Sequence, residues 1–220
     1  MMTCPSDPGL RDVPAIRYGA CFRYSPCGMS VSARRSRRYC ARLKARDTGF
    51  LAHCARRVHR DVTAGGVLAD FFGAAPALVP VPSSMRTLPG SLTAAGALAE
   101  ALLSEGLGST VWPGLARRHT VMRSSRATPG CRTSAQEQFR SLAVEPVSGG
   151  LADILLVDDI VSRGRTLIVA ALRLREAFPS ARIAGFALMR TTSLVADIET
   201  VMDPCAGQIR WVRGDARRNP

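Results

Sequence analysis

The chain has 220 residues, of which 46% are hydrophobic and 5% aromatic, and its formal net charge is +13. This composition is typical of a folded domain with a proper core, and it excludes a disordered or collagen-like chain. No apolar run reaches the roughly 18 residues that a transmembrane helix needs. The N-terminus has no basic segment leading into an apolar one, and no two of the seven cysteines form a C-x-x-C pair. We therefore expect a cytoplasmic protein with reduced thiols and no membrane contact.

The positive charge is concentrated near the N-terminus. Residues 1–60 contain thirteen Lys or Arg and three acidic residues, and Lys44 is the only lysine of the chain. Five arginines recur there at helical spacing: Arg34, Arg35, Arg38, Arg42 and Arg46. Such a face attracts phosphorylated small molecules or nucleic acid, and the alternative is a solvated Arg-rich surface without a ligand.

Hydrophobic periodicity predicts alternating strands and helices. The expected strands are Ile16–Tyr24 within an otherwise irregular N-terminal arm, 77–82, 109–115, 141–144, 152–159, 182–189 and an edge strand at 209–212. The expected helices are two over 32–60 that are broken near Thr48, one over 92–103 and one over 166–178. This order predicts an α/β fold with an open, mainly parallel, twisted sheet flanked by helices.

The domain organisation follows from the same pattern. We expect one structural domain, in which residues 1–62 form the arm and the Arg-rich helical segment and residues 63–220 form the α/β core. The two chain ends would form a small cover, or hood, over the edge of the sheet.

The most informative stretch is an apolar run that ends in Asp158 and Asp159 and is followed by the turn 162–164 and an amphipathic helix. A short bounded apolar run is typical of a strand buried on both faces of a parallel sheet, and ligands bind beyond the carboxyl ends of such strands. The acids can hold sugar hydroxyls or a hydrated Mg²⁺. The loop amides and the helix N-terminus can hold a phosphate. A ligand with both features is a ribose 5-phosphate.

Other interpretations of this stretch fit less well. A nucleotide-binding P-loop needs a lysine after its glycine, but the only lysine of the chain is Lys44. A dinucleotide fingerprint needs three spaced glycines with the acid downstream, but this stretch has one glycine, and the acids precede it. A solvated strand end with Ser162 as a helix cap accounts for the serine but leaves two adjacent carboxylates unexplained, because placing them at a buried strand end costs stability.

The segment I-L-L-V-D-D-I-V-S-R-G-R-T resembles the phosphoribosyl pyrophosphate motif of type I phosphoribosyltransferases. The resemblance assigns the acid pair to Asp158 and Asp159 and the 5-phosphate loop to Ser162, Arg163, Gly164, Arg165 and Thr166. It implies the fold of that family and the transfer of a phosphoribosyl group from Mg²⁺-bound phosphoribosyl pyrophosphate to an acceptor, commonly a nitrogen. Arg163 departs from the family pattern, in which Thr or Ser is commoner, and adds a cation beside the expected 5-phosphate.

A weaker resemblance covers about residues 39–190. The run V-P-V-P followed by Ser83, Ser84 and Arg86 resembles the pyrophosphate loop of competence protein F-like phosphoribosyltransferases, and Lys44 lies in a segment similar to the helix before it. The N-terminal zinc module of paired C-x-x-C motifs that this group often carries is missing from the sequence.

The polar and basic segment 117–140 takes the place of the family's flexible catalytic loop. A closing loop can bring arginines to a leaving pyrophosphate, whose charge grows in the transition state. The candidates are Arg118 and Arg123 as catalytic residues, with Arg126, Arg132 and Lys44 as additional ones.

Two functional hypotheses follow. In the first, the protein is a phosphoribosyltransferase whose cofactor is Mg²⁺ and whose acceptor is an unidentified base or amine. In the second, it senses phosphoribosyl pyrophosphate or a nucleotide without catalysis and binds nucleic acid or a protein through its Arg-rich face. A second copy of the chain, in a homodimer, is a further candidate partner.

Overall fold

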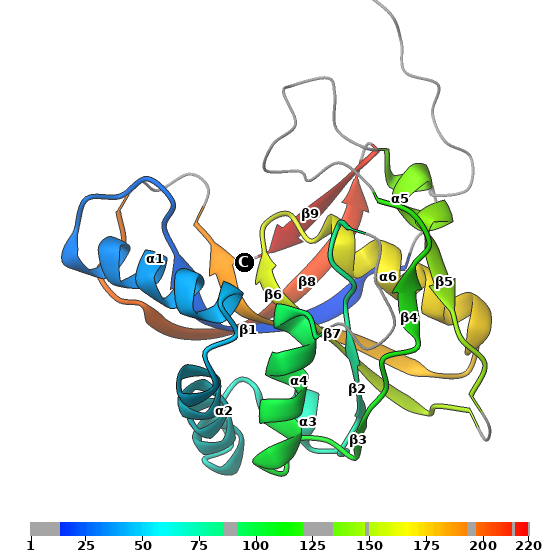
Figure 1. The fold of residues 1–220 in the computed structure, drawn as a ribbon, viewed down its shortest axis with the longest axis horizontal. Coiled ribbons are helices and arrows are strands. Elements are labelled where there is room, and N and C mark those ends of the chain that lie inside the picture. Colours follow the sequence, from blue (N-terminus) through cyan, green and yellow to red (C-terminus); the bar gives the residue numbers. More distant parts are fainter. Residues whose placement is uncertain are drawn as a thin grey trace, which may run out of the picture.

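The centre of the computed structural model is a seven-stranded sheet in the order β3-β2-β6-β7-β1-β8-β9 (Figure 1). The strands are β1 Ile16–Tyr24, β2 Ala77–Pro80, β3 Thr110–Val111, β6 Asp153–Val161, β7 Arg182–Thr191, β8 Met202–Val212 and β9 Asp215–Asn219. Four neighbouring pairs are parallel, and only the pairs β1–β8 and β8–β9 are antiparallel. The predicted open, mainly parallel α/β sheet is therefore confirmed. The structure describes residues 14–85, 92–120, 134–147, 150–192, 197–212 and 214–219.

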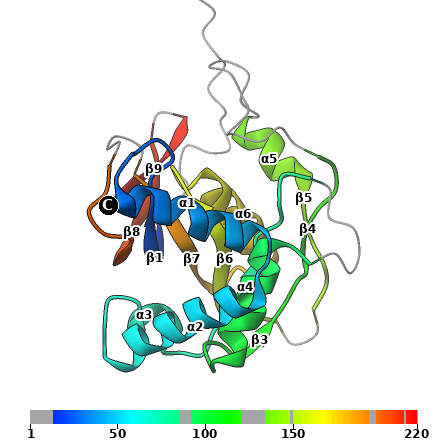
Figure 2. The ribbon, with the colours of Figure 1, turned by 60° about the vertical axis from the view of Figure 1, so that its left-hand side comes forward.

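Helices cover both faces of this sheet, as the two views in Figures 1 and 2 show. One face packs against α1 Val31–Lys44, α2 Thr48–Thr63, α3 Ala69–Phe72 and α4 Ala94–Ser104. The other face packs against α6 Arg165–Ala177. Beside α6 lie α5 Ala135–Ser141 and a two-stranded antiparallel sheet of β4 Leu115–Arg117 and β5 Leu142–Val144. Within the described residues, no helix is long and apolar enough to cross a membrane.

Short polar side chains set where the first helices begin. Ser30, Asp47 and Thr93 precede α1, α2 and α4, and each side chain accepts a hydrogen bond from a first-turn amide. Such caps satisfy amides that have no partner inside the helix. The cap at Asp47 also explains the predicted break near Thr48, because it starts a second helix three residues after α1 ends.

The central strand β6 carries the site. Leu155 and Val157 are buried against α1–α4, whereas Ile154 and Leu156 are buried against α6. Burying each of these side chains contributes roughly 1.5–3 kcal/mol, so the strand is firmly held on both faces. Asp158, the next residue, is thereby fixed in the carboxyl half of β6, three residues before the strand ends at Val161.

The expected strand 109–115 is divided between β3 and β4 of two different sheets, and the expected strand 152–159 continues to Val161. Two other strands have a different place in the sheet from the one expected. The strand Ile16–Tyr24 is confirmed, but it lies inside the sheet between β7 and β8 and not in an arm outside it. The expected edge strand at 209–212 is part of the longer β8, and the edge is β9. Both differences arise from pairing with distant segments: β1 pairs with β7, and β9 is too polar to reveal itself by periodicity, since only Ala216 in it is buried.

Candidate functional site

The carboxyl end of β6 presents the two predicted acids. Asp158 pairs in register with Ala187 of β7, and the backbone amide of Asp159 donates a hydrogen bond of 2.8 Å to Asp158 Oδ1. Lys44, at the last position of α1, forms an ion pair with Asp159 Oδ2. The structure thus brings together three of the predicted site residues from segments more than 110 residues apart in the chain.

The electrostatics of this acid pair are unusual. The pKa of Asp158 is raised from its ordinary 3.8 to about 7. Burial is the largest cause and the negative charge of Asp159 adds to it, while the Asp159 amide and Lys44 act in the opposite direction. Asp158 therefore carries a proton much of the time at neutral pH. A cation or a pair of hydroxyl donors beside Asp158 would favour its ionised form. The site is therefore suited to a ligand that supplies such a cation or such hydroxyls.

The loop after β6 forms the second half of the site. Ser162 is exposed, and Gly164 adopts φ +88° directly before the thirteen residues of α6. A Cβ atom at Gly164 would lie 2.6–2.8 Å from three atoms of the Ile209 side chain. Gly164, not Ser162, is the residue that precedes the helix, and it provides no side-chain cap for the first amides of α6. Amides of this kind, at the positive end of a helix dipole, bind phosphate groups.

The two arginines of this loop have a partner in the C-terminal strand. Arg163 Nη1 lies 2.7 Å from Asp215 Oδ2, and Arg165 Nε donates to Asp215 Oδ1 at 3.0 Å. Burial would raise the pKa of Asp215, but the hydrogen bonds from Arg165 and Arg163 outweigh it and lower the pKa. Asp215 therefore neutralises part of the charge that Arg163 was expected to offer a phosphate. Thr166, in the first turn of α6, is half-buried.

The predicted pyrophosphate loop follows β2, the neighbour of β6. Ser83 is exposed and Ser84 is half-buried. The guanidinium of Arg117, 4% exposed, donates from Nε to the carbonyl of Ser83 at 2.7 Å and from Nη1 to the hydroxyl of Ser141. Arg117 thus ties the loop after β2 to the base of the segment 117–140.

The remaining predicted cations fall in two groups. Arg118 is exposed at the end of β4, where its amide donates to the Ser141 carbonyl at 2.8 Å. Arg86, Arg123, Arg126 and Arg132 lie outside the described residues.

The fit of a magnesium ion depends on Asp158 and Asp159. Among the residues that the structure describes, no group of three or more His, Cys, Asp or Glu could hold a metal ion. Two carboxylates at one edge are nevertheless the oxygen donors that Mg²⁺ prefers, and this ion usually keeps several waters and shares ligand phosphates. The donor set therefore fits an ion that arrives with a phosphorylated ligand.

A crystal structure of a hypoxanthine phosphoribosyltransferase from Staphylococcus aureus is similar to this chain. The two chains are 15% identical, the TM-score is 0.34, and the match covers 68% of this chain and 70% of that one. No protein-family model matches the sequence, and no curated protein matches it. A likeness this distant carries no functional argument, so the function is inferred from the site itself.

Sequence reasoning missed three side chains at this edge: Arg117, Asp215 and Arg190. Asp215 and Arg117 contact residues that are 24 to 52 positions away in the chain, and no local sequence pattern predicts such contacts. Arg190 had a usable signal, since it ends the buried run of β7 and so reaches the same sheet edge as Asp158.

Proposed function

We propose that this protein is a phosphoribosyltransferase that binds phosphoribosyl pyrophosphate with Mg²⁺ at the carboxyl edge of β6. One observation carries the proposal. Adjacent carboxylates in the carboxyl half of a buried parallel strand are followed within five residues by a positive-φ glycine at the start of a long helix. The first part suits ribose hydroxyls and the second suits a phosphate.

Each part of the ligand has a proposed partner. Asp158 and Asp159 hold the ribose hydroxyls, directly or through Mg²⁺ and water, and the ion pair with Lys44 orients Asp159. The amides of 162–166 hold the 5-phosphate, together with the Ser162 and Thr166 hydroxyls. Ser83, Ser84 and Arg86 meet the pyrophosphate, and Arg118 or Arg123 stabilises its charge as it leaves.

The reaction follows from this placement. The bond between the anomeric carbon and the pyrophosphate oxygen breaks, a new bond forms from that carbon to an acceptor nitrogen, and the nitrogen gives its proton to solvent or a nearby base. Mg²⁺, when bound, neutralises charge on the pyrophosphate. The acidic edge favours the positive charge that develops on the ribose, because preorganised charge in a partly buried site stabilises a transition state.

The test is a calorimetric titration of phosphoribosyl pyrophosphate in Mg²⁺ buffer. The double variant Asp158→Asn, Asp159→Asn should lose binding while it keeps the far-ultraviolet circular dichroism of the wild type. Asp153→Asn, at the opposite end of β6, is the matched control and should bind normally. Equal binding by the double variant and the wild type would refute the assignment of these acids.

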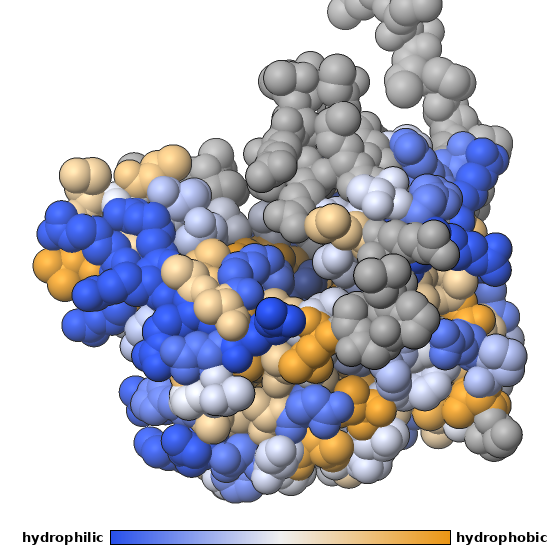
Figure 3. All heavy atoms as spheres, in the orientation of Figure 1, coloured by the Kyte–Doolittle hydropathy of each residue, from blue (hydrophilic) through white to orange (hydrophobic). Residues whose placement is uncertain are grey.

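A second candidate function rests on the Arg-rich face. Arg34, Arg35, Arg38 and Arg42 are all exposed on α1, and hydrophilic residues gather over this helix in Figure 3. Next to them is a cavity of about 190 Å³, whose lining includes Arg35, Arg57, His53 and Tyr39. Guanidiniums beside an aromatic ring suit a phosphorylated ligand or a nucleic acid.

A non-catalytic sensor that binds nucleic acid would use this face. Its affinity for single-stranded DNA or RNA should fall steeply with salt, and the quadruple change of Arg34, Arg35, Arg38 and Arg42 to Gln should reduce the slope. No binding at 50 mM salt would dismiss this candidate.

A further inference from the structure

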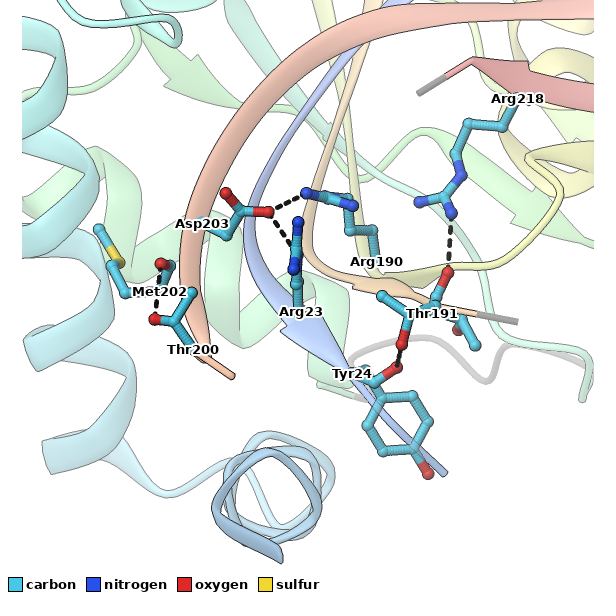
Figure 4. A network of polar contacts seen from close by, with 9 residues as sticks. Arg23, Tyr24, Arg190, Thr191, Thr200, Met202, Asp203 and Arg218 are labelled. Carbon is cyan, nitrogen blue, oxygen red and sulfur yellow. Dashed lines mark hydrogen bonds and ion pairs between the residues drawn. The ribbon is translucent and has the colours of Figure 1, made fainter. Parts of the chain in front are cut away.

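A cluster of guanidiniums lies on β7, the strand next to β6, and on β1 and β9 beyond it (Figure 4). Arg190 of β7 and Arg23 of β1 are register partners, and both form ion pairs with Asp203 of β8. The Arg23 contact measures 2.5 Å from Nε to Oδ2. Arg218 of β9 donates from Nη2 to the carbonyl of Thr191 at 2.7 Å.

This cluster has more positive charge and more donors than its partners satisfy. Among the described residues, Arg23 and Arg190 share a single carboxylate, and Arg218 forms no ion pair. Arg190 is 9% exposed, and its Nε is buried without a hydrogen-bond partner, as is Nη1 of Arg218. A buried donor without a partner costs about 1–3 kcal/mol, and more when it is charged. Both orphaned nitrogens are therefore suited to acceptor oxygens of a ligand.

Tyr18 lies beside this cluster. Its side chain is fully buried, and Arg218 lies over its ring at 5.8 Å from the centroid. Burial raises the pKa of the Tyr18 hydroxyl, and the charges of Arg218 and Arg190 both act against that rise. The side chains of Arg23 and Asp203, 36% and 29% exposed, leave the cluster open to solvent.

The cluster is adjacent to the proposed phosphoribosyl site. Arg190 is the register partner of Val161, the residue that precedes the 162–164 loop. The hydroxyls of Ser162 and Thr191 lie 3.2 Å apart, and Thr191 is also the residue that Arg218 holds. A group bound by Arg190 and Arg218 would therefore lie beside the loop that is proposed to hold the phosphoribosyl group.

We propose that Arg190 and Arg218 bind an acidic group, a carboxylate or a phosphate, of the acceptor that attacks the phosphoribosyl carbon. This inference rests on the proposed function and defines its substrate class as a nitrogen nucleophile with an acid substituent. In the free protein Asp203 neutralises part of the cluster, and the acidic group of the acceptor competes with it for Arg190.

The experiment compares acceptors with and without an acid group. Two matched pairs, nicotinate with nicotinamide and orotate with uracil, are titrated by calorimetry into the protein saturated with Mg²⁺ and ribose 5-phosphate. At least one acid should bind ten or more times more tightly than its neutral counterpart. Arg190→Gln should remove that preference, because truncating one partner of a buried charge pair costs at least about tenfold in affinity. Arg210→Gln, a change at an exposed position of β8, should leave that preference intact, because the Arg210 side chain hydrogen-bonds to its neighbour Gln208 on the same strand.

Asp203→Asn separates binding from a purely structural role. Because this change removes the competing carboxylate, it should tighten acid binding several-fold, whereas a structural network that binds nothing would only lose stability. The proposal is overturned if acids and neutral counterparts bind alike or not at all, or if Arg190→Gln keeps the preference. It is also overturned if Arg190→Gln weakens ribose 5-phosphate binding instead, because the anion of the cluster would then be the 5-phosphate.

Failure of the proposed function has a different signature. If the proposed function is wrong, the wild type does not bind phosphoribosyl pyrophosphate, whichever acid is tested as the acceptor.

Discussion

The acid pair at the end of β6 should cost stability at neutral and alkaline pH, and Asp158→Asn should recover it. A pKa of about 7 in the folded protein against 3.8 ordinarily corresponds to about 4 kcal/mol at about 1.4 kcal/mol per pKa unit. Asp158 is not fully shielded from solvent, so we expect a gain of about 1–3 kcal/mol. Asparagine can still accept the hydrogen bond from the Asp159 amide, so the local geometry survives.

The sign of the pH dependence distinguishes this effect from a change in packing. The folded protein holds the Asp158 proton more tightly than the unfolded chain, so the cost is absent below pH 3.8, grows as the pH rises, and is complete above about pH 7. Urea denaturation at pH 4.5 and pH 8 should therefore give a small gain for Asp158→Asn at the lower pH and the full gain at the higher one. A variant that is less stable than the wild type at pH 8, or a gain that does not change with pH, would refute the reasoning.

Two matched changes sharpen this result. Asp153, whose pKa the hydrogen bond from Arg182 lowers, should respond with the opposite sign: Asp153→Asn loses stability above pH 3.8 and loses none in strong acid. Lys44→Gln removes a charge that lowers the pKa of Asp158. The transition in the Asp158 titration, followed by NMR of the carboxyl carbon, should therefore move to higher pH.

Two further predictions concern the loops. Arg117→Gln leaves the Ser83 carbonyl and the Ser141 hydroxyl without their donor and should lower the free energy of unfolding by about 1–3 kcal/mol. The exposed neighbour Arg118→Gln should be neutral in the same urea titration, and equal losses would contradict the structural role of Arg117. Gly164→Ala should cost about 1–3 kcal/mol, because it forces an alanine to φ +88° against Ile209. In an Ile209→Ala background the same change should cost less, since the contact is gone and only the backbone strain is left, and an undiminished cost would show that the contact is unimportant.

Much of the fold and the first half of the site could be predicted from the sequence, because both depend on local pattern. The run before Asp158 is apolar over the length of a strand, and Gly164 stands where a turn enters a helix, so the acids and the loop fall at the same edge. Lys44 is the exception, because it was proposed only from the resemblance to a known family. No local sequence pattern connects it with Asp159, which is 115 residues later in the chain.

The rest of the site depends on pairing between distant segments. The partner of Arg163 is Asp215, in a polar strand with a single buried residue, and no periodicity predicts such a strand. Arg190 and Arg23 look like ordinary charges at the ends of apolar runs. Their meeting at Asp203 follows only from the sheet order, in which β1 comes to lie between β7 and β8.

The most direct test of the central claim is pyrophosphate release from phosphoribosyl pyrophosphate, measured with Mg²⁺ and a panel of nitrogen bases and amines that includes acidic members. We predict that the wild type releases pyrophosphate in step with the consumption of at least one acceptor, and that the double change of Asp158 and Asp159 to Asn abolishes the release. Phosphoribosyl pyrophosphate that stays intact with every acceptor, or a double variant as active as the wild type, would contradict the assignment of this protein as a phosphoribosyltransferase.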